Sequence, residues 1–157
     1  MLNSSMIRLA LYQPDIPQNT GAAMRLCACL GVGLDIIEPC GFLLDDKKIR
    51  RSAMDYATAT DLIRHKSWDR FLQNYRGKRR IILMTTKAET AYTKFSFEEG
   101  DILLAGSESA GAPPEVHETA DHRLTIPMRE GLRSLNIVNA AAMILGEALR
   151  QTERIEP

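Results

Sequence analysis

Three short polar segments follow apolar runs that have the composition of strands, and their residue types could bind a ligand. These segments are Thr85–Lys87, Gly106–Gly111 and Pro127–Asn136. In an open parallel sheet, ligands bind beyond the carboxyl ends of the strands, where such loops meet. The third segment also opens a helix that carries Ser134 and Asn136 near its start, and the free N–H groups at a helix start attract polar ligands. We therefore expect a binding site where these loops come together.

The Gly106–Gly111 loop could receive a flat, uncharged group. Its two glycines permit close approach of a ligand such as an adenine, and Glu108 stands among small residues where it can accept hydrogen bonds. The loop is neither a Walker loop nor the dinucleotide fingerprint, because the sequence patterns of both are missing. A tight turn with a surface glutamate is the simpler alternative and stays open at this point.

A small serine hydrolase is an alternative of another class, with Ser107 or Ser109 as its nucleophile. The segment that holds these serines lacks the leading glycine of the Gly-x-Ser-x-Gly elbow. Asp121 and His122 follow in chain order, but adjacent residues of a strand point to opposite faces. They are therefore a poor acid–base pair, and the sequence favours this reading least.

The Cys and His residues do not predict a metal site. Cys27 and Cys29 are two residues apart on an expected helix, so their side chains point away from each other. The three histidines show none of the usual ligand spacings; they are His65, His117 and His122. We expect structural cysteines, surface histidines and no bound metal.

Arg25 is the basic residue most open to a functional interpretation. It follows Asn19 by six residues on the helix that leaves the first loop, and the residues from Leu26 to Leu30 are nearly all apolar. We expect its guanidinium to point at a partner or a substrate. An exposed arginine without a role is the alternative.

Strands and helices are expected to alternate along the chain, which predicts an α/β domain with a mainly parallel sheet. The last helix has no charged residue before Glu147 and is apolar nearly all round, so we expect it to be buried on most sides. We expect Asn19 or Thr20 to cap the first helix and Ser67 to cap another. The expected strands are 7–12, 34–37, 81–85, 101–105 and 124–126, the expected helices are 19–30, 67–74 and 135–152, and 45–64 looks helical in pieces.

Length and composition suit a single globular domain over residues 1–157, with Met1–Ser5 as a short extension before Met6. No apolar run reaches the roughly 18 residues that a membrane span needs, and no signal segment opens the chain. The three cysteines are an odd number in a chain large enough to fold without disulfides. We therefore expect a cytoplasmic protein that does not enter a membrane.

The formal net charge is zero, but the basic residues are unevenly distributed. From Lys47 to Arg80 the chain has eleven Lys or Arg against three Asp or Glu. A locally basic segment is what a polyanion would dock on, and a solvated face is the alternative.

Three separated motifs together resemble those of the SPOUT RNA methyltransferases. They are Asn19-Thr20-Gly21-Ala22-Ala23-Met24-Arg25, Leu104-Ala105-Gly106-Ser107-Glu108-Ser109-Ala110-Gly111, and Ile126-Pro127-Met128 with Ser134-Leu135-Asn136-Ile137-Val138-Asn139. The short length and the opening from Leu11 to Gly21 are similar to the TrmL (YibK-like) branch of that family. The resemblance covers nearly the whole chain, and three motifs in order at strand ends are specific.

This resemblance implies methyl transfer from S-adenosyl-L-methionine to the ribose 2′-hydroxyl of the wobble nucleotide, cytidine or modified uridine, in the anticodon stem-loop of tRNA. S-adenosyl-L-homocysteine would be the second product. The resemblance also implies helices on both faces of the sheet, a C-terminal trefoil knot of a kind that folds almost always avoid, and a homodimer packed partly through the last helix. The implied cofactor pocket is lined by Met84, Thr85, Gly106, Ile126, Ser134 and Leu135.

Four further residues match the catalytic and substrate positions of the family, namely Asn19, Arg25, Glu108 and Asn136. Arg25 would activate the ribose hydroxyl. Because the pKa of arginine exceeds ~12, stabilisation of a developing alkoxide is a better description than general-base catalysis. Asn136 and Glu108 would orient Arg25 or the ribose, and proximity would supply much of the remaining rate.

Two features depart from the pattern of the family, one in the last helix and one in the second motif, and both concern the grip on tRNA. Gly146 stands where many wobble methyltransferases have a tyrosine, and Ser107 and Ser109 replace the proline and threonine common in the second motif. We expect no further RNA-binding module, and we expect the Lys47–Arg80 segment on a dimer surface to hold the RNA. A non-catalytic protein that binds RNA or nucleotide on the same scaffold is the main alternative.

Overall fold

The computed structural model describes residues 5–132 and 134–152, and these residues form one six-stranded sheet. The strand order is β3-β2-β1-β5-β4-β6, and every pairing is parallel. The predicted α/β fold with a parallel sheet is confirmed. The strands are β1 (Arg8–Tyr12), β2 (Gly33–Ile37), β3 (Leu62–His65), β4 (Ile81–Met84), β5 (Ile102–Ala105) and β6 (His122–Leu124).

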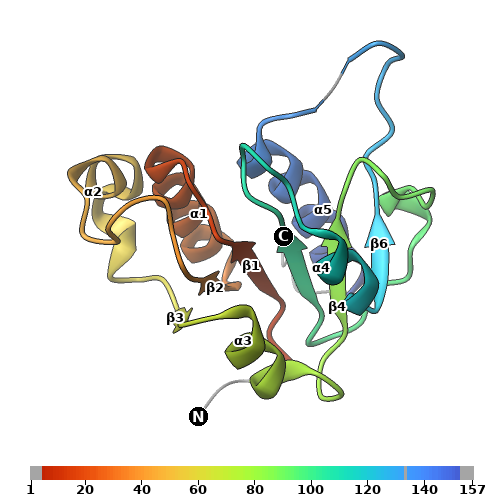
Figure 1. The fold of residues 1–157 in the computed structure, drawn as a ribbon, viewed down its shortest axis with the longest axis horizontal. Coiled ribbons are helices and arrows are strands. Elements are labelled where there is room, and N and C mark those ends of the chain that lie inside the picture. Colours follow the sequence, from red (N-terminus) through yellow and green to blue (C-terminus); the bar gives the residue numbers. More distant parts are fainter. Residues whose placement is uncertain (1–4, 133, 153–157) are drawn as a thin grey trace.

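Helices cover both faces of the sheet, as Figure 1 shows. Residues of α1, α2 and α5 share one apolar cluster with the sheet, and residues of α3 and α4 share a second. The α-helices are α1 (Pro17–Leu30), α2 (Lys47–Ala53), α3 (Trp68–Tyr75), α4 (Pro114–Thr119) and α5 (Ile137–Gln151), and the 3-10 helices are η1 (Met54–Ala57) and η2 (Tyr92–Lys94). None of the helices within the described residues has the length and apolar character of a membrane span.

The connection between β4 and β5 passes around the outer edge of β6. The amide of Tyr92 donates to the Thr125 carbonyl at 2.9 Å, and the amide of Thr125 donates to the Thr90 carbonyl at 2.9 Å. Further along the connection, the amide of Phe97 donates to the side-chain oxygen of Gln151 at 2.8 Å, in the last turn of α5. The final part of the chain is therefore wrapped by an earlier connection.

Helix α1 packs against α2 at a point close to its own start. A Cβ on Gly21 would lie 2.6 Å from the Ile49 carbonyl oxygen and 2.6 Å from the Cβ of Ser52, so the two helices approach where only glycine fits. This contact places α2 next to Asn19, two residues earlier in α1.

Near the amino ends of the strands, a fully buried arginine is neutralised by two aspartates. Arg8 Nε donates to Asp35 Oδ1 at 3.0 Å, and Nη1 donates to Asp61 Oδ2 at 2.9 Å. Arg8 and Asp35 have no exposed surface, and a Cβ on Gly33 would lie 2.1 Å from Arg8 Nη1. Gly33 thus leaves the space through which the Arg8 side chain passes.

Several predicted elements differ from those observed. Strand β3 was not expected, and β6 spans His122–Leu124 rather than 124–126. Helix α1 begins at Pro17, and its N-cap Ile16 makes no side-chain capping bond, so the prediction of Asn19 or Thr20 as the cap was wrong. A proline early in a helix lacks the amide that would otherwise need a partner, which explains a start without such a cap.

Two other predicted helix starts have side-chain caps. Ser67 caps α3 as predicted, accepting from the Arg70 amide. Helix α5 begins at Ile137 with Asn136 as its cap, slightly later than the predicted start. Of the predicted extension Met1–Ser5, residues 1–4 lie outside the described residues.

Candidate active site

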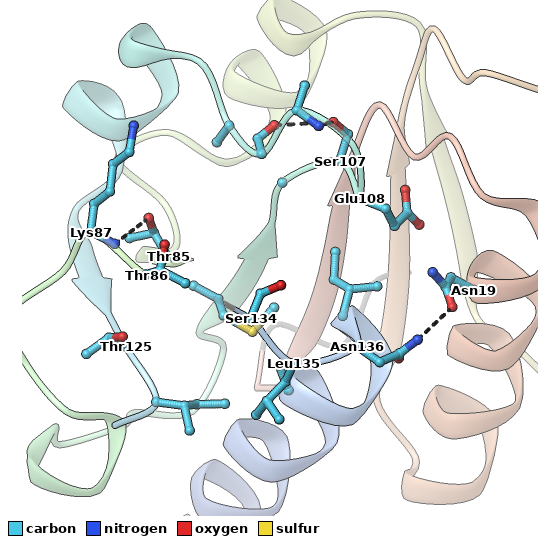
Figure 2. A pocket seen from close by; sticks show the side chains of 18 of the residues that line it. Asn19, Thr85, Thr86, Lys87, Ser107, Glu108, Thr125, Ser134, Leu135 and Asn136 are labelled. Atoms are coloured by element: carbon cyan, nitrogen blue, oxygen red, sulfur yellow. Dashed lines mark hydrogen bonds between the residues drawn. The ribbon is translucent and has the colours of Figure 1, made fainter. Parts of the chain in front are cut away.

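A cavity of about 560 Å³ lies beyond the carboxyl ends of β4, β5 and β6, beside the start of α5 (Figure 2). Parts of all three polar segments identified in the sequence line it. Nine of the ten predicted site residues are among those that line the cavity, and Arg25 is not. The nine are Asn19, Met84, Thr85, Gly106, Glu108, Ile126, Ser134, Leu135 and Asn136.

The walls of the cavity combine apolar side chains with short hydroxyl groups. Met84, Ile126 and Leu135 contribute apolar surface, and Ile137 and Ala140 extend it along the first turn of α5. The hydroxyl groups come from Thr85, Thr86, Ser107, Thr125 and Ser134. Such a lining suits a ligand with a flat apolar part and a few polar atoms.

The Gly106–Gly111 loop folds back on itself at one wall of the cavity. The amide of Ser107 donates to the Gly111 carbonyl at 3.1 Å, and the amide of Gly111 donates to the Ser107 carbonyl at 2.9 Å. A Cβ on Gly106 would lie 2.4 Å from the carbonyl carbon of Gly111, and Gly111 has a φ of 68°. The shape of this loop therefore depends on both glycines.

Asn136 links the two helices that border the cavity. Its Oδ1 accepts from the amides of Val138 at 2.9 Å and Asn139 at 3.3 Å, which caps α5. Its Nδ2 donates to Asn19 Oδ1 at 3.2 Å, a bond drawn in Figure 2. Both functions of the amide are used, so the orientation of Asn136 is fixed.

Glu108 lies at the same end of the cavity as Asn19 and Asn136 (Figure 2). Its Oε2 accepts from the amide of Asp15 at 2.9 Å, and the Asp15 carboxylate accepts from the hydroxyl of Ser109. Burial raises the pKa of Glu108, and the neighbouring Asp15 carboxyl raises it further. The site thus contains two adjacent carboxyl groups, of which the sequence predicted only Glu108.

Arg25 is exposed on α1 and lies against η1 rather than in the cavity. Its Nη1 lies 3.3 Å from the sulfur of Met54, and its guanidinium carbon lies 5.4 Å from the ring centroid of Tyr56. The expectation that this guanidinium points at a partner or a substrate stays a prediction. Its predicted catalytic role needs a substrate that reaches beyond the cavity or a second copy of the chain.

Lys87 and His117 line the cavity although neither was a predicted site residue. Figure 2 shows Lys87 at the end opposite Asn19. Burial lowers the pKa of His117, and the nearby charges of Lys87 and Arg123 lower it further. Lys87 belongs to the polar Thr85–Lys87 segment, so its position after a strand could have identified it as a site residue. His117 lies in the short helix α4, and nothing in the sequence around it indicated a site.

The residues of the hydrolase alternative do not come together. Asp121 Oδ2 accepts from the amide of Ile81 at 2.7 Å, at the amino end of β4, and His122 begins β6. Ser107 and Ser109 follow the carboxyl end of β5, and therefore lie at the opposite end of the parallel strands. This arrangement does not form a Ser-His-Asp triad.

The basic residues between Lys47 and Arg80 do not form one surface, so the expectation of a single basic stripe was wrong. Helix α2 lies on the same face of the sheet as α1 and α5. It carries Lys47, Lys48, Arg50 and Arg51. Helix α3, which carries Arg70, packs on the other face, and further basic residues follow it at Arg76 and Lys78–Arg80. Two of those are engaged within the chain, since Arg79 donates to the Met6 carbonyl at 2.8 Å and Arg80 pairs with Asp101 at 2.7 Å.

Comparison with known proteins identifies the family. Residues 6–146 match the SpoU rRNA Methylase family. The chain belongs to this family. It is 56% identical over 144 residues to the tRNA (cytidine(34)-2'-O)-methyltransferase of Beijerinckia indica subsp. indica, with 91% of this chain and 90% of the relative covered. The enzyme of the same name from Escherichia coli K12 is 40% identical over 148 residues, covering 93% and 94%.

Several solved structures share the fold. One, from work on structural insights into the 2-OH methylation of C/U34 on tRNA, has a TM-score of 0.90 at 40% identity and covers 95% of this chain and 97% of the other. The SpoU methyltransferase AviRb from Streptomyces viridochromogenes, in complex with the cofactor AdoMet, has a TM-score of 0.88 at 25% identity, covering 96% and 62%. The resemblance to SPOUT enzymes is confirmed. These neighbours imply a C-terminal knot, and the passage of the β4–β5 connection around β6 is consistent with it.

Proposed function

We propose that this chain transfers the methyl group of S-adenosylmethionine to the ribose 2′-hydroxyl of nucleotide 34 in tRNA, with cytidine as the preferred base. The observation that carries this proposal is the likeness to tRNA (cytidine(34)-2'-O)-methyltransferases, at 56% identity over 91% of the chain. The family match over residues 6–146 spans every loop that lines the cavity.

The cavity fits the cofactor in size and in chemistry. Small-molecule sites range from ~300 to ~1,000 Å³, and the apolar walls with strand-end backbone suit an adenosine group. The residues proposed to hold it are Met84, Thr85, Gly106, Ile126, Ser134 and Leu135. When bound, S-adenosylmethionine supplies an electrophilic methyl group, so no metal is required.

The ribose is proposed to bind at the end of the cavity formed by Asn19, Glu108 and Asn136. The mutual hydrogen bond of the two asparagines fixes their orientation before substrate arrives, and such preorganisation reduces the entropy lost in reaching the transition state. Arg25 is proposed to stabilise the developing alkoxide, because a guanidinium stays charged at any working pH.

Methyl transfer to defined tRNAs tests the proposal. The chain is incubated with S-adenosylmethionine carrying a tritiated methyl group and with unmodified tRNA that has cytidine at position 34. We expect incorporation, and none into a matched tRNA with 2′-deoxycytidine at that position, because the acceptor hydroxyl is missing. Cofactor binding without transfer would favour the non-catalytic alternative, and equal transfer to both tRNAs would place the reaction at another nucleotide.

The exposed basic face of α2 is proposed to contact the RNA backbone. Lys47, Lys48, Arg50 and Arg51 are exposed, and α2 packs on α1 beside Asn19 at the ribose end of the cavity. Changing Arg50 and Arg51 to Ala should raise the KM for tRNA. It should also make the dependence of log K on log salt concentration less steep, by the equivalent of about two phosphate contacts. Arg70 and Arg76 on the opposite face provide the matched double variant, which should leave both quantities unchanged.

A homodimer is proposed as the active form. Met143 on α5 and Leu135 just before it are 43% and 42% exposed, which leaves apolar surface at the last helix for a second copy. Sedimentation analysis tests the dimer, and a monomer at working concentration would contradict it. Mixing Arg25→Ala with Asn136→Ala protein then tests whether sites are shared, because activity returns only if Arg25 of one copy serves the cavity of the other.

A further inference from the structure

Methylation of a ribose hydroxyl releases a proton, which some group must accept. The hydroxyl oxygen bonds to the methyl carbon, the carbon–sulfur bond breaks with its electron pair going to sulfur, and the O–H proton departs. Three titratable side chains line the cavity among the described residues, those of Lys87, Glu108 and His117. Arg25 is not among them, because it lies against η1 outside the cavity.

Position separates these three candidates. Lys87 lies at the far end of the cavity from Asn19 (Figure 2). His117 is close enough to Lys87 for that charge to lower its pKa, which associates it with the same end. Glu108 lies beside Asn19 and Asn136, at the end of the cavity where the ribose is proposed to bind.

The carboxylate of Glu108 is held in a defined orientation. Its Oε2 accepts from the amide of Asp15 at 2.9 Å, across 93 residues of sequence. Asp15 is itself fixed, because its carboxylate accepts from Ser109 and the amide of Gly41 donates to the Pro14 carbonyl at 3.0 Å. A carboxylate has about four lone-pair sites, so Glu108 keeps capacity for a proton.

The charges around Glu108 also suit this task. Asp15 from the β1–α1 loop and Cys40 from the β2–α2 loop are the titratable groups that face it. Burial and nearby carboxylates raise the pKa of Cys40 to about 11, so its thiol is neutral. Beyond Cys40, Glu38 and Arg64 form an ion pair at 2.7 Å. Burial raises the pKa of Glu108, and the Asp15 carboxyl beside it raises it further, which favours proton acceptance.

We propose that Glu108 is the catalytic residue that accepts the ribose hydroxyl proton, and that Asp15 is a positioning residue that orients and tunes the Glu108 carboxylate. This inference rests on the proposed methyl transfer and adds the destination of the proton. Arg25 then stabilises negative charge on the ribose oxygen while Glu108 receives the proton.

The pH dependence of methyl transfer by Glu108→Gln tests the catalytic role. The wild-type rate should fall on the acid side as Glu108 becomes protonated. Glu108→Gln should be slower by about 100-fold or more and should lose that acid limb, whereas Glu108→Asp should keep the limb at a reduced rate. The matched control Glu118→Gln, on exposed α4 surface, should behave as wild type. A Glu108→Gln enzyme that keeps the wild-type limb would overturn the assignment.

Asp15→Asn tests the positioning role. Asparagine keeps the backbone amide that binds Glu108 and can still accept from Ser109, but it removes the negative charge. The pKa of Glu108 should therefore fall and the acid limb should move to lower pH, with cofactor affinity unchanged. Asp69→Asn on the opposite face is the control and should not move it. An unmoved limb in Asp15→Asn would contradict this role, whereas a wild-type chain that methylates no tRNA would refute the proposed function itself.

Discussion

Two polar clusters at opposite ends of the sheet use charge in opposite ways. At the amino ends of the strands, Arg8 lies between Asp35 and Asp61 and has no exposed surface. At the carboxyl ends, Asp15 and Glu108 are adjacent carboxyl groups, and neither forms an ion pair within residues 5–132 and 134–152. The first cluster pairs its buried charges with each other, whereas in the second Glu108 has a raised pKa and lines a cavity. Removing a charge should therefore lower the stability of the fold at the amino ends of the strands and lower methyl transfer at the carboxyl ends.

The largest expected effect on stability is at the amino end. Arg8→Met removes the partner of the buried Asp35 carboxylate and should lower the free energy of unfolding by about 3–5 kcal/mol, measured by urea denaturation. Arg150→Met, at an exposed ion pair with Glu147, should change it little. Similar unfolding midpoints for the two variants would show that the buried cluster does not stabilise the fold as described.

At the carboxyl end, Gly106→Ala should act on binding more than on folding. The added Cβ would lie 2.4 Å from the Gly111 carbonyl carbon, so the loop must change shape. Calorimetry should find S-adenosylhomocysteine bound about tenfold more weakly or not at all, a loss of ~1.4 kcal/mol or more. Gly146→Ala is the matched control, since a Cβ there meets nothing within 4 Å, and it should bind normally. Normal binding by Gly106→Ala would remove this loop from the cofactor site.

Asn136 allows the structural and functional contributions of one residue to be separated. Asn136→Ala loses the cap of α5, which should lower the free energy of unfolding by about 1 kcal/mol, and it also loses the bond to Asn19. Asn136→Ser can keep the cap but is too short for the Asn19 bond, so it should keep stability and lose methyl-transfer rate. Full activity in Asn136→Ser would show that the asparagine pair does not orient the substrate.

The smallest expected effect is on the stability of Glu108→Gln, and its sign is informative. The folded-state pKa of Glu108 is raised, so the folded chain binds this proton more tightly than the unfolded chain. Its contribution is therefore present at low pH and is lost as pH rises through the folded-state pKa. Glutamine avoids this loss, so the Tm of the variant relative to wild type should increase between pH 4 and pH 8. A relative decrease over that interval would mean that the ionised carboxylate is stabilised by contacts that compensate for its burial.

The sequence predicted the central strands well because they are apolar runs buried on both faces. β3 was missed because Leu62–His65 is a short edge strand that includes Arg64 and His65. β6 was placed two residues late because the apolar run continues past Leu124, whereas pairing with β4 starts at His122. The ends of β3 and β6 are set by pairing with strands that are distant in sequence, and local composition does not predict that pairing.

Residue type and order along the sequence were sufficient to find nine residues that line the cavity. They were not sufficient to find the residues that hold those nine in position. Asp15 contacts Glu108 across 93 residues, a proximity that follows only from the sheet order. The basic segment misled for the same reason, since α2 and α3 are near in sequence but lie on opposite faces. Such contacts depend on topology and could not be obtained from spacing along the chain.

Amide hydrogen exchange with and without S-adenosylhomocysteine tests most directly the claim that the three strand-end loops form one methyl-donor site. We expect new protection in residues 84–87, 106–112 and 125–136, and unchanged exchange in α3 on the opposite face. Protection confined to other segments, or none at a ligand concentration that saturates binding, would contradict it.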